Sequence, residues 1–276
     1  MCQLLGISYS KPTPFNRLFA EFRKRGEHNP HAWGVAYWPS DGRGPAVVRE
    51  ARAAHESPLA AALASSQIPA VTVVAHVRFG TTAGEGSLRS TANAHPFLFR
   101  ANGRDWAGAH NGYLRGVAPL ERRPEGTTDS EAFFCRVADE LEIAGPEEEA
   151  RIVAELAGEY AGAGKLNFLL SDGERLFFFA GHPASAGGLY FLEAAHRGVR
   201  AVAVATKPLF TGEGWREAEP GRLYVARGGR VVESRAVRGA FRTVAWRAPG
   251  MPSGRHLSYI DYLEAALKEG RKAAVN

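Results

Sequence analysis

The second residue, Cys2, is the first side chain in the sequence whose type and position suit catalysis. Removal of the initiator methionine, which the small size of cysteine favours, would leave Cys2 with a free α-amine beside its own thiol. An α-amine has a reference pKa of about 7.7 to 8.0 and a thiol one of about 8.5, so the amine can accept the thiol proton near neutral pH. We interpret Cys2 as a nucleophile with its own base, the alternative being a buried structural cysteine.

Two charged residues further along could each bind a group of opposite charge. Arg78 ends an apolar run and precedes Gly80 and Thr81, so its planar guanidinium can face a carboxylate, which lysine would bind less specifically. Asp129 begins a predicted helix and could pair with an ammonium group. Each has a structural alternative, a salt bridge at a strand end for Arg78 and a favourable charge at a helix N-terminus for Asp129.

A histidine and an asparagine–glycine pair complete the candidates. His95 lies in a predicted turn over residues 93–97, where it could orient a loop, act as an acid or be purely structural. Asn111 and Gly112 follow a predicted strand, and the side-chain amide and the backbone N–H could both donate to a developing oxyanion. Asn-Gly is also the pattern of a tight β-hairpin turn, so both interpretations stay open.

The elements that must position these residues are short strands and helices. Apolar runs predict strands over residues 3–9, 33–38, 46–50, 71–77, 106–110, 165–171, 175–180, 189–193, 199–205, 222–227 and 230–235. Apolar spacing, capping residues and prolines predict helices over residues 15–22, 59–66, 132–142, 147–160 and 256–271. Because short turns join most neighbouring strands, we expect antiparallel sheets covered by helices, an α+β fold in one domain.

The composition is that of a packed protein. The 276 residues are 45% hydrophobic and 23% charged, which excludes a disordered chain and a disulfide-stapled miniprotein. The net charge of +5 comes from scattered basic residues, so nucleic acid is not an expected partner. No run of roughly 20 apolar residues predicts a membrane span, and a chain with only two cysteines fits a reducing, cytoplasmic location. Cysteines and histidines lack metal-ligand spacing, so we expect no metal and no cofactor.

The order of the motifs resembles that of the class II glutamine amidotransferases, whose nucleophile is the N-terminal residue. The shared segments are Cys2, His-Val-Arg-Phe-Gly-Thr at 76–81, Asn-Ala-His-Pro-Phe at 93–97, His-Asn-Gly at 110–112 and Thr-Asp-Ser-Glu at 128–131. The stand-alone YafJ-like branch is most similar, through Cys-x-Leu-Leu-Gly at the start, Trp33-Gly34, and Ala-Thr-Lys-Pro-Leu at 205–209.

The resemblance implies the fold of these N-terminal nucleophile (Ntn) hydrolases, a four-layer αββα sandwich of two antiparallel sheets between helices. A single domain would cover residues 2–276, with its active-site motifs in residues 2–131, its C-terminal strands and helix completing the sandwich, and no synthase domain. One departure from the family pattern is His31-Ala32, where relatives often have Asp-Gly. Because alanine removes backbone freedom there, we expect the departure to affect the pocket wall.

The resemblance also implies a reaction in which Cys2 attacks the γ-amide of L-glutamine and forms a thioester. Asn111 and Gly112 would stabilise the oxyanion. The substrate-binding residues would be Arg78 at the α-carboxylate, Asp129 at the α-ammonium group, and in addition Thr81 and His95.

Three functions fit these residues. The first is hydrolysis of glutamine to glutamate and ammonia, which is released or passed to a separate synthase. The second is hydrolysis of another γ-glutamyl amide, which would use the same residues and differ only on the leaving-group side of the pocket. The third is a catalytically silent protein that binds a glutamine-like ligand, an interpretation that a retained Met1 would favour because it blocks the amine.

Overall fold

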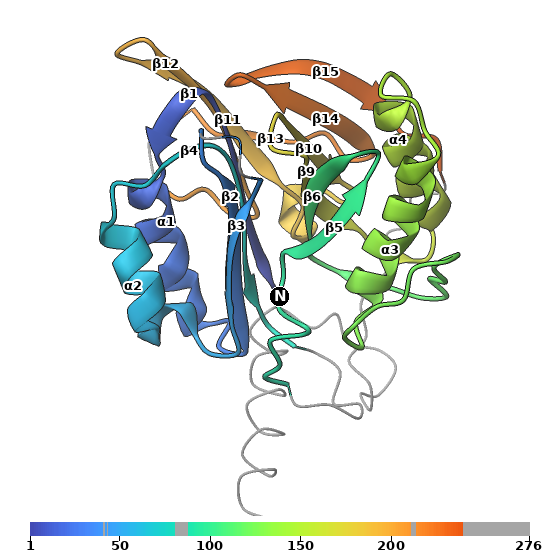
Figure 1. Ribbon diagram of the computed structural model, residues 1–276, viewed down its shortest axis with the longest axis horizontal. Helices are drawn as coiled ribbons and strands as arrows, with labels where there is room; N and C mark the ends of the chain where they lie inside the picture. The colour runs from blue at the N-terminus through green and yellow to red at the C-terminus, as the bar shows by residue number, and fades with distance from the viewer. Residues whose placement is uncertain (41, 43, 81–87, 211–213, 240–276) are drawn as a thin grey trace, which may run out of the picture. The chain divides into compact units, whose positions relative to one another are not determined.

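Two antiparallel sheets carry the described part of the chain. The structure is a computed structural model that describes residues 1–40, 42, 44–80, 88–210 and 214–239 (Figure 1). The first sheet contains, in spatial order, β13 (Arg216–Glu217), β11 (Tyr190–His196), β12 (Val199–Ala205), β1 (Gln3–Pro14), β4 (Pro69–Arg78), β2 (Ala32–Trp38) and β3 (Ala46–Glu50). The second contains β15 (Arg230–Ala236), β14 (Arg222–Arg227), β10 (Arg175–Ala180), β9 (Asn167–Ser171), β6 (Arg104–His110) and β5 (Phe97–Ala101). A separate two-stranded pair joins β7 (Tyr113–Leu114) and β8 (Gly164–Lys165).

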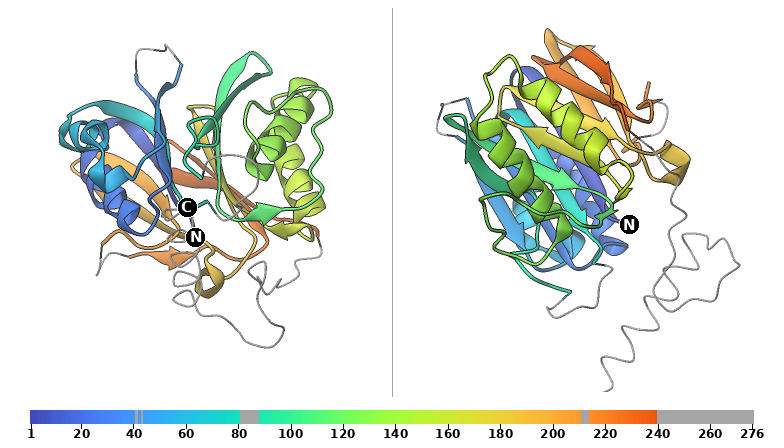
Figure 2. Two further views of the ribbon diagram at one scale, coloured as in Figure 1. Left: turned by 90° about the horizontal axis from the view of Figure 1, so that it is seen from below. Right: turned by 90° about the vertical axis from the view of Figure 1, so that its right-hand side faces the viewer.

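Helices cover the outer face of each sheet. The described α-helices are α1 (Asn16–Arg23), α2 (Pro58–Ser65), α3 (Asp129–Glu142) and α4 (Glu149–Tyr160), and the described 3₁₀ helices are η1 (Lys24–Glu27), η2 (Ala54–Glu56) and η3 (Ala184–Ala186). Figures 1 and 2 show α1 and α2 on the outer face of the seven-stranded sheet and α3 and α4 on that of the six-stranded sheet. The expected four-layer αββα sandwich is therefore confirmed.

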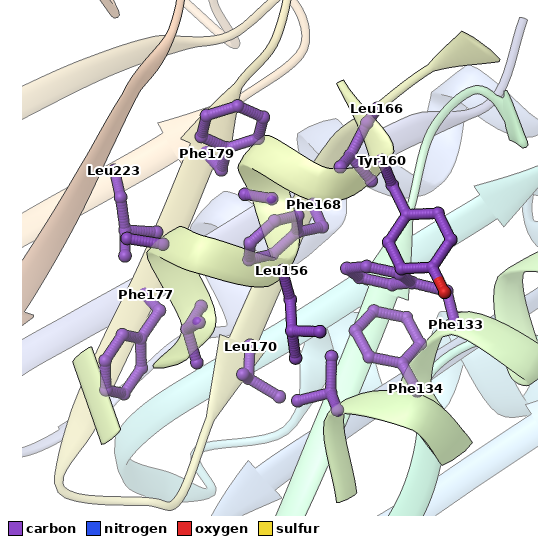
Figure 3. Close-up of a cluster of buried hydrophobic side chains, with 14 of the residues drawn as sticks. Phe133, Phe134, Leu156, Tyr160, Leu166, Phe168, Leu170, Phe177, Phe179 and Leu223 are labelled. Atoms are coloured by element: carbon purple, nitrogen blue, oxygen red, sulfur yellow. The ribbon is translucent and has the colours of Figure 1, made fainter. Parts of the chain in front are cut away.

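The apolar residues of the strands alternate between two faces, which gives the sandwich three buried layers. In β1, Leu5 packs toward the helices with Phe19, whereas Leu4 lies in the layer between the sheets. In the second sheet, Leu169 faces the layer between the sheets, whereas its neighbour Phe168 packs outward with α3 and α4. Figure 3 shows this outer cluster beneath the two helices. The period of two that predicts strands also decides which layer each residue fills.

Local signals explain where the helices begin. The Ser57 side chain accepts a hydrogen bond from the Ala60 N–H at 3.0 Å, with proline at the first position of α2, as predicted. The Thr128 hydroxyl accepts from the Glu131 N–H at 3.2 Å and starts α3. The Glu131 carboxylate accepts from the backbone N–H groups of Glu125 and Gly126, so it orders the segment before the helix.

Some expectations need correction. The predicted strand over 165–171 is two strands separated at Leu166, because β8 pairs with β7 whereas β9 pairs with β6 and β10. The sequence patterns do not predict β5, β7 or β13; the last two have only two residues each, too few to show a period. The predicted helix over 256–271 lies outside the described residues. All described elements belong to one compact unit, Met1–Arg242, and the single domain over 2–276 stays a prediction.

A buried ion network ties α4 to the six-stranded sheet. Glu149, the first residue of α4, is fully buried and accepts hydrogen bonds from Asn102, Arg104 and Arg175. Asp172 pairs with the same two arginines at 2.7 Å. Burial alone would raise the pKa of Glu149, but the hydrogen bonds from Arg175, Arg104 and Asn102 hold it below its usual value.

We expect Glu149→Gln to reduce the free energy of unfolding at pH 7 by about 3 kcal/mol, because breaking a buried ion pair leaves charge uncompensated. Since the pKa of Glu149 is lower in the folded than in the unfolded chain, its contribution is present at neutral pH and lost as the pH falls through the folded value. Urea unfolding at pH 7 and pH 4 should therefore show a smaller difference from wild type in acid. Glu155→Gln, in an exposed pair with Arg151, is the control and should change little. Equal losses for both variants would contradict the prediction.

Candidate active site

The N-terminal residues lie at the end of a central strand, between the two halves of the sandwich (Figures 1 and 2). The Cys2 Sγ accepts a hydrogen bond from the Phe79 N–H at 3.3 Å, and the thiol lies 3.5 Å from the Phe79 carbonyl oxygen. Two residues on, the Leu4 N–H donates to the Thr206 Oγ1 at 3.0 Å. Cys2 is half-buried, so its thiol is fixed by the segment after β4 without being enclosed in the core.

Arg78, the last residue of β4, directly precedes Phe79, whose N–H donates to the Cys2 Sγ. Its guanidinium donates to the Leu88 carbonyl oxygen at 2.6 Å, and the residue is buried. The Gly80 N–H donates to Nδ1 of His31 at 2.7 Å. Burial, followed by the charges of Arg78 and Arg89, lowers the pKa of His31 to about 4. His31 is therefore an uncharged hydrogen-bond acceptor at neutral pH that fixes the segment carrying Arg78. Thr81 lies outside the described residues.

The Asn111–Gly112 turn is not a hairpin. It follows β6, but β7 pairs with β8 and not with β6. The Asn111 N–H donates to the Asn167 carbonyl oxygen at 2.8 Å, and the Asn167 side chain donates back to the Asn111 carbonyl oxygen at 3.1 Å. Gly112 has a φ of +157°, and a Cβ there would lie 1.7 Å from the Lys165 carbonyl oxygen. Only glycine fits this close approach, which the hairpin interpretation does not explain.

The side-chain amide of Asn111 is buried without a partner. Asn111 is 1% exposed, and its Nδ2 donates to no acceptor in the described part of the chain. A buried donor without a partner is costly and rare in folded proteins. This turn therefore combines a rigid backbone with an amide group that is available to a ligand.

His110 supports the turn with both ring nitrogens. Its Nε2 lies 2.9 Å from the Lys165 carbonyl oxygen and its Nδ1 lies 2.8 Å from the Ser130 Oγ. Because a carbonyl oxygen can only accept, we assign the proton to Nε2, and Nδ1 accepts from the Ser130 hydroxyl. Burial lowers the pKa of His110, with the nearby Asp129 acting in the opposite direction.

The segment before β5 forms hydrogen bonds with two other segments, one at His110 and one at Thr127. The backbone N–H of His110 donates to Nδ1 of His95 at 3.1 Å. The Asn93 side chain accepts from the Thr127 N–H at 2.9 Å and donates to the Thr127 hydroxyl at 3.2 Å. His95 is 3% exposed and stacks on His76 with ring centroids 4.0 Å apart. This geometry favours the loop-orienting interpretation of His95 over a contact with substrate.

Asp129 begins α3 directly after the Thr128 cap. Its Oδ2 accepts a hydrogen bond from the Leu114 N–H, so it fixes β7 next to the Asn111–Gly112 turn. Asp129 is half-buried and lies at the helix N-terminus, where a carboxylate is favoured. The hydrogen bonds of Leu114 to Asp129 and of His110 to His95 thus fix the chain on both sides of the Asn111–Gly112 turn.

Sequence patterns missed Lys165, Asn167 and the hydrogen-bonding role of His31. Lys165 Nζ lies 3.0 Å from the Met1 Sδ and donates to the Ala186 carbonyl oxygen. Burial lowers the pKa of Lys165 to about 8, and the Coulomb interaction with Cys2 opposes this shift. No spacing or composition signal marks these residues, because their roles come from contacts between segments distant in sequence.

The N-terminal amine lies in the same surroundings as Lys165. Burial lowers the pKa of the Met1 amine to about 6; Cys2 opposes this shift, and Lys165 and Lys207 add to it. The Met1 amine is therefore largely uncharged near neutral pH. The arrangement places a thiol and a buried amide donor on neighbouring segments, a combination that suits acyl transfer.

Two negative findings concern the described residues. No group of three or more His, Cys, Asp or Glu side chains among them could hold a metal ion. None of the described helices has the length and apolar character that a membrane span requires.

Comparison with known proteins shows similarity to one family over most of the chain. The family model of the class II glutamine amidotransferases matches residues 1–248. YafJ of Escherichia coli strain K12, which carries the name of a glutamine amidotransferase, is 32% identical over 84% of this chain and its own whole length. A Haemophilus influenzae protein, also named as a glutamine amidotransferase, is 29% identical to this chain. The match covers 84% of this chain and 86% of the length of that protein.

Two solved structures share the fold. A protein of Pseudomonas aeruginosa, described as a predicted glutamine amidotransferase, superposes with a TM-score of 0.58 at 24% identity, over 84% of this chain and all of its own. The glutamine phosphoribosylpyrophosphate amidotransferase of B. subtilis gives a TM-score of 0.65 at 17% identity, over 86% of this chain. This chain covers 49% of the B. subtilis enzyme.

Two buried asparagines allow a matched test of the unpartnered amide. We expect Asn111→Ala to lower the free energy of unfolding by no more than about 1 kcal/mol, or to raise it, because Nδ2 donates to no described group and its burial is itself costly. Asn167→Ala removes donors to Asn111 and Gly187 and the acceptor of the Gly181 N–H, and should cost about 2 to 4 kcal/mol. Urea unfolding of both variants measures the difference. A larger loss for Asn111→Ala than for Asn167→Ala would contradict this account.

Proposed function

This chain belongs to the class II glutamine amidotransferases, and on that premise we propose that it hydrolyses the γ-amide of L-glutamine to glutamate and ammonia. The observation that carries the proposal is the unpartnered Nδ2 of Asn111, a buried donor next to Gly112. Because no described group accepts a hydrogen bond from this donor, it can donate to an oxygen of the substrate. Such a hydrogen bond stabilises the negative charge that the oxygen gains in the transition state.

The substrate is held by its two charged ends. Arg78 binds the α-carboxylate and Asp129 the α-ammonium group, which directs the side-chain amide toward Cys2. Thr81 is a further substrate contact in this proposal. His95 acts from inside the protein, since its Nδ1 accepts from the backbone N–H of His110 and thereby orients the oxyanion-binding turn.

The reaction requires removal of Met1, which frees the α-amine of Cys2. The amine accepts the thiol proton, and Sγ forms a bond to the γ-carbonyl carbon of glutamine. The carbonyl oxygen becomes negative and accepts hydrogen bonds from the Asn111 Nδ2 and the Gly112 N–H. The carbon–nitrogen bond then breaks, and the amine passes its proton to the departing nitrogen, which leaves as ammonia. Water hydrolyses the thioester to glutamate and restores the thiol.

Ammonia is released or is transferred to a separate synthase. We also propose that residues 2–276 form one amidotransferase domain. Two observations support this: the family match covers residues 1–248, and the match to YafJ spans 84% of this chain and the whole of YafJ.

The first test is the intact mass of the purified protein before and after 6-diazo-5-oxo-L-norleucine, a glutamine analogue that alkylates thiols with loss of nitrogen gas. We expect one adduct on protein that lacks Met1, and none on Cys2→Ala. Cys135→Ala is the matched control and should keep the adduct, because Cys135 lies in α3 and its pKa is raised to about 11, chiefly by burial.

Other outcomes separate the remaining functions. If the mature protein releases no ammonia from glutamine but cleaves other γ-glutamyl amides, its substrate is one of those amides and not glutamine. Protein that retains Met1 and takes no adduct would favour a silent glutamine-like ligand binder and would overturn the proposal.

Loss of the oxyanion donor should affect the rate more than binding. Asn111→Ala is expected to lower kcat for glutamine hydrolysis about 10²- to 10³-fold, which corresponds to about 2.7 to 4 kcal/mol of lost transition-state stabilisation. KM should change little, because the two ends of glutamine are still bound. Steady-state ammonia release measures both constants. A raised KM with unchanged kcat would remove Asn111 from the oxyanion hole.

A further inference from the structure

The ring of His110 packs against the glycine of the Asn111–Gly112 turn. A Cβ on Gly112 would lie 2.7 Å from the His110 Nε2 and 1.7 Å from the Lys165 carbonyl oxygen. These two atoms are themselves hydrogen-bonded at 2.9 Å. Gly112 therefore rests on a hydrogen-bonded pair, and its place in the turn depends on where the ring and the carbonyl group are held.

Ser130 holds the other side of this ring. Its Oγ lies 2.8 Å from the His110 Nδ1. Burial lowers the pKa of His110, so the ring is uncharged at neutral pH. Because Nε2 donates to the Lys165 carbonyl oxygen, Nδ1 carries no proton and accepts from the Ser130 hydroxyl. With both nitrogens bonded, the ring cannot rotate or change its tautomer without breaking a hydrogen bond.

A serine hydroxyl beside a histidine is also the arrangement of an activated nucleophile. Here both residues are buried, Ser130 with 5% and His110 with 1% of its surface exposed. The far nitrogen of the ring is bonded to the main chain, and the ring packs against the turn. This pair therefore supports the turn and is not a second reactive centre.

We propose that Ser130 is a positioning residue, whose hydroxyl holds the His110 ring and, through it, the Lys165 carbonyl oxygen against Gly112. The proposal rests on the proposed glutamine hydrolysis, because it assigns to Ser130 the support of the turn that binds the oxyanion. Ser130 directly follows Asp129 in α3. The first turn of this helix thus serves both ends of the substrate, the ammonium group through Asp129 and the oxyanion through Ser130 and His110.

Three variants test the hydroxyl of Ser130. Ser130→Ala removes the hydroxyl with a small change in volume, and Ser130→Thr keeps a hydroxyl at the same position. Ser65→Ala is the matched control, because Ser65 is an exposed serine of α2 whose hydroxyl donates to the Ala61 carbonyl oxygen of the same helix at 3.1 Å.

The first measurement is amide hydrogen exchange, followed by NMR at pH 7 without glutamine. The reporter is the Asn111 N–H, which donates to the Asn167 carbonyl oxygen at 2.8 Å, and the reference is the N–H of Leu169, a fully buried residue of β9. We expect Ser130→Ala to speed exchange at Asn111 about tenfold relative to Leu169, because loss of the hydrogen bond makes local opening of the turn easier. Ser130→Thr and Ser65→Ala should keep the wild-type ratio.

The second measurement is steady-state release of ammonia from glutamine. Ser130→Ala is expected to lower kcat about tenfold with little change in KM, because the turn acts on the transition state while both ends of glutamine stay bound. Ser130→Thr and Ser65→Ala should keep the wild-type constants.

The proposal is overturned if the exchange ratio of Asn111 to Leu169 in Ser130→Ala equals that of wild type, because the hydroxyl then adds only general stability or nothing. Equal effects of Ser130→Thr and Ser130→Ala would also overturn it, since the hydroxyl would not be the group that matters. Hydrogen exchange needs no substrate, so it tests Ser130 even if the protein does not hydrolyse glutamine. Wild-type protein that releases no ammonia would contradict the proposed function alone.

Discussion

The position of β1 in the middle of its sheet is the constraint on which the rest of the site depends. Chain termini are usually poorly ordered, yet β1 pairs with β12 on one side and β4 on the other, so the first residues are held along both edges. Cys2 directly precedes this strand, and the Phe79 N–H after β4 donates to its Sγ. A terminal residue acquires the fixed geometry that a nucleophile needs because its strand is central.

Uncharged histidines connect the loops around this terminus. His31 accepts from the Gly80 N–H, His95 accepts from the His110 N–H, and His110 donates to the Lys165 carbonyl oxygen. Burial lowers the pKa of all three rings, so they keep one acceptor nitrogen at neutral pH. Backbone groups that would otherwise be unsatisfied are thereby paired, and the loops take one arrangement relative to one another.

The interactions that stabilise the fold lie apart from the proposed site. The ion network of Glu149 and the aromatic cluster beneath α3 and α4 lie on the outer side of the six-stranded sheet and hold the helices. In contrast, the Asn111 Nδ2 is buried without a partner among the described residues, an arrangement that costs about 1 to 3 kcal/mol in a folded protein. Interactions elsewhere in the fold must offset this cost.

The sequence by itself determined the fold class, most strands and helices, and the order of motifs that identifies the family, because hydrophobic period, capping residues and residue spacing are local properties. It could not choose between a hairpin and an oxyanion-binding turn at Asn111–Gly112, since the same two residues fit both. Only the tertiary structure decided that β7 pairs with β8, that His31 accepts from Gly80, and that Lys165 connects the turn to the N-terminus. These contacts join atoms that lie tens to more than a hundred residues apart in the sequence. Many of them involve backbone groups, whose hydrogen bonds do not require a particular residue type.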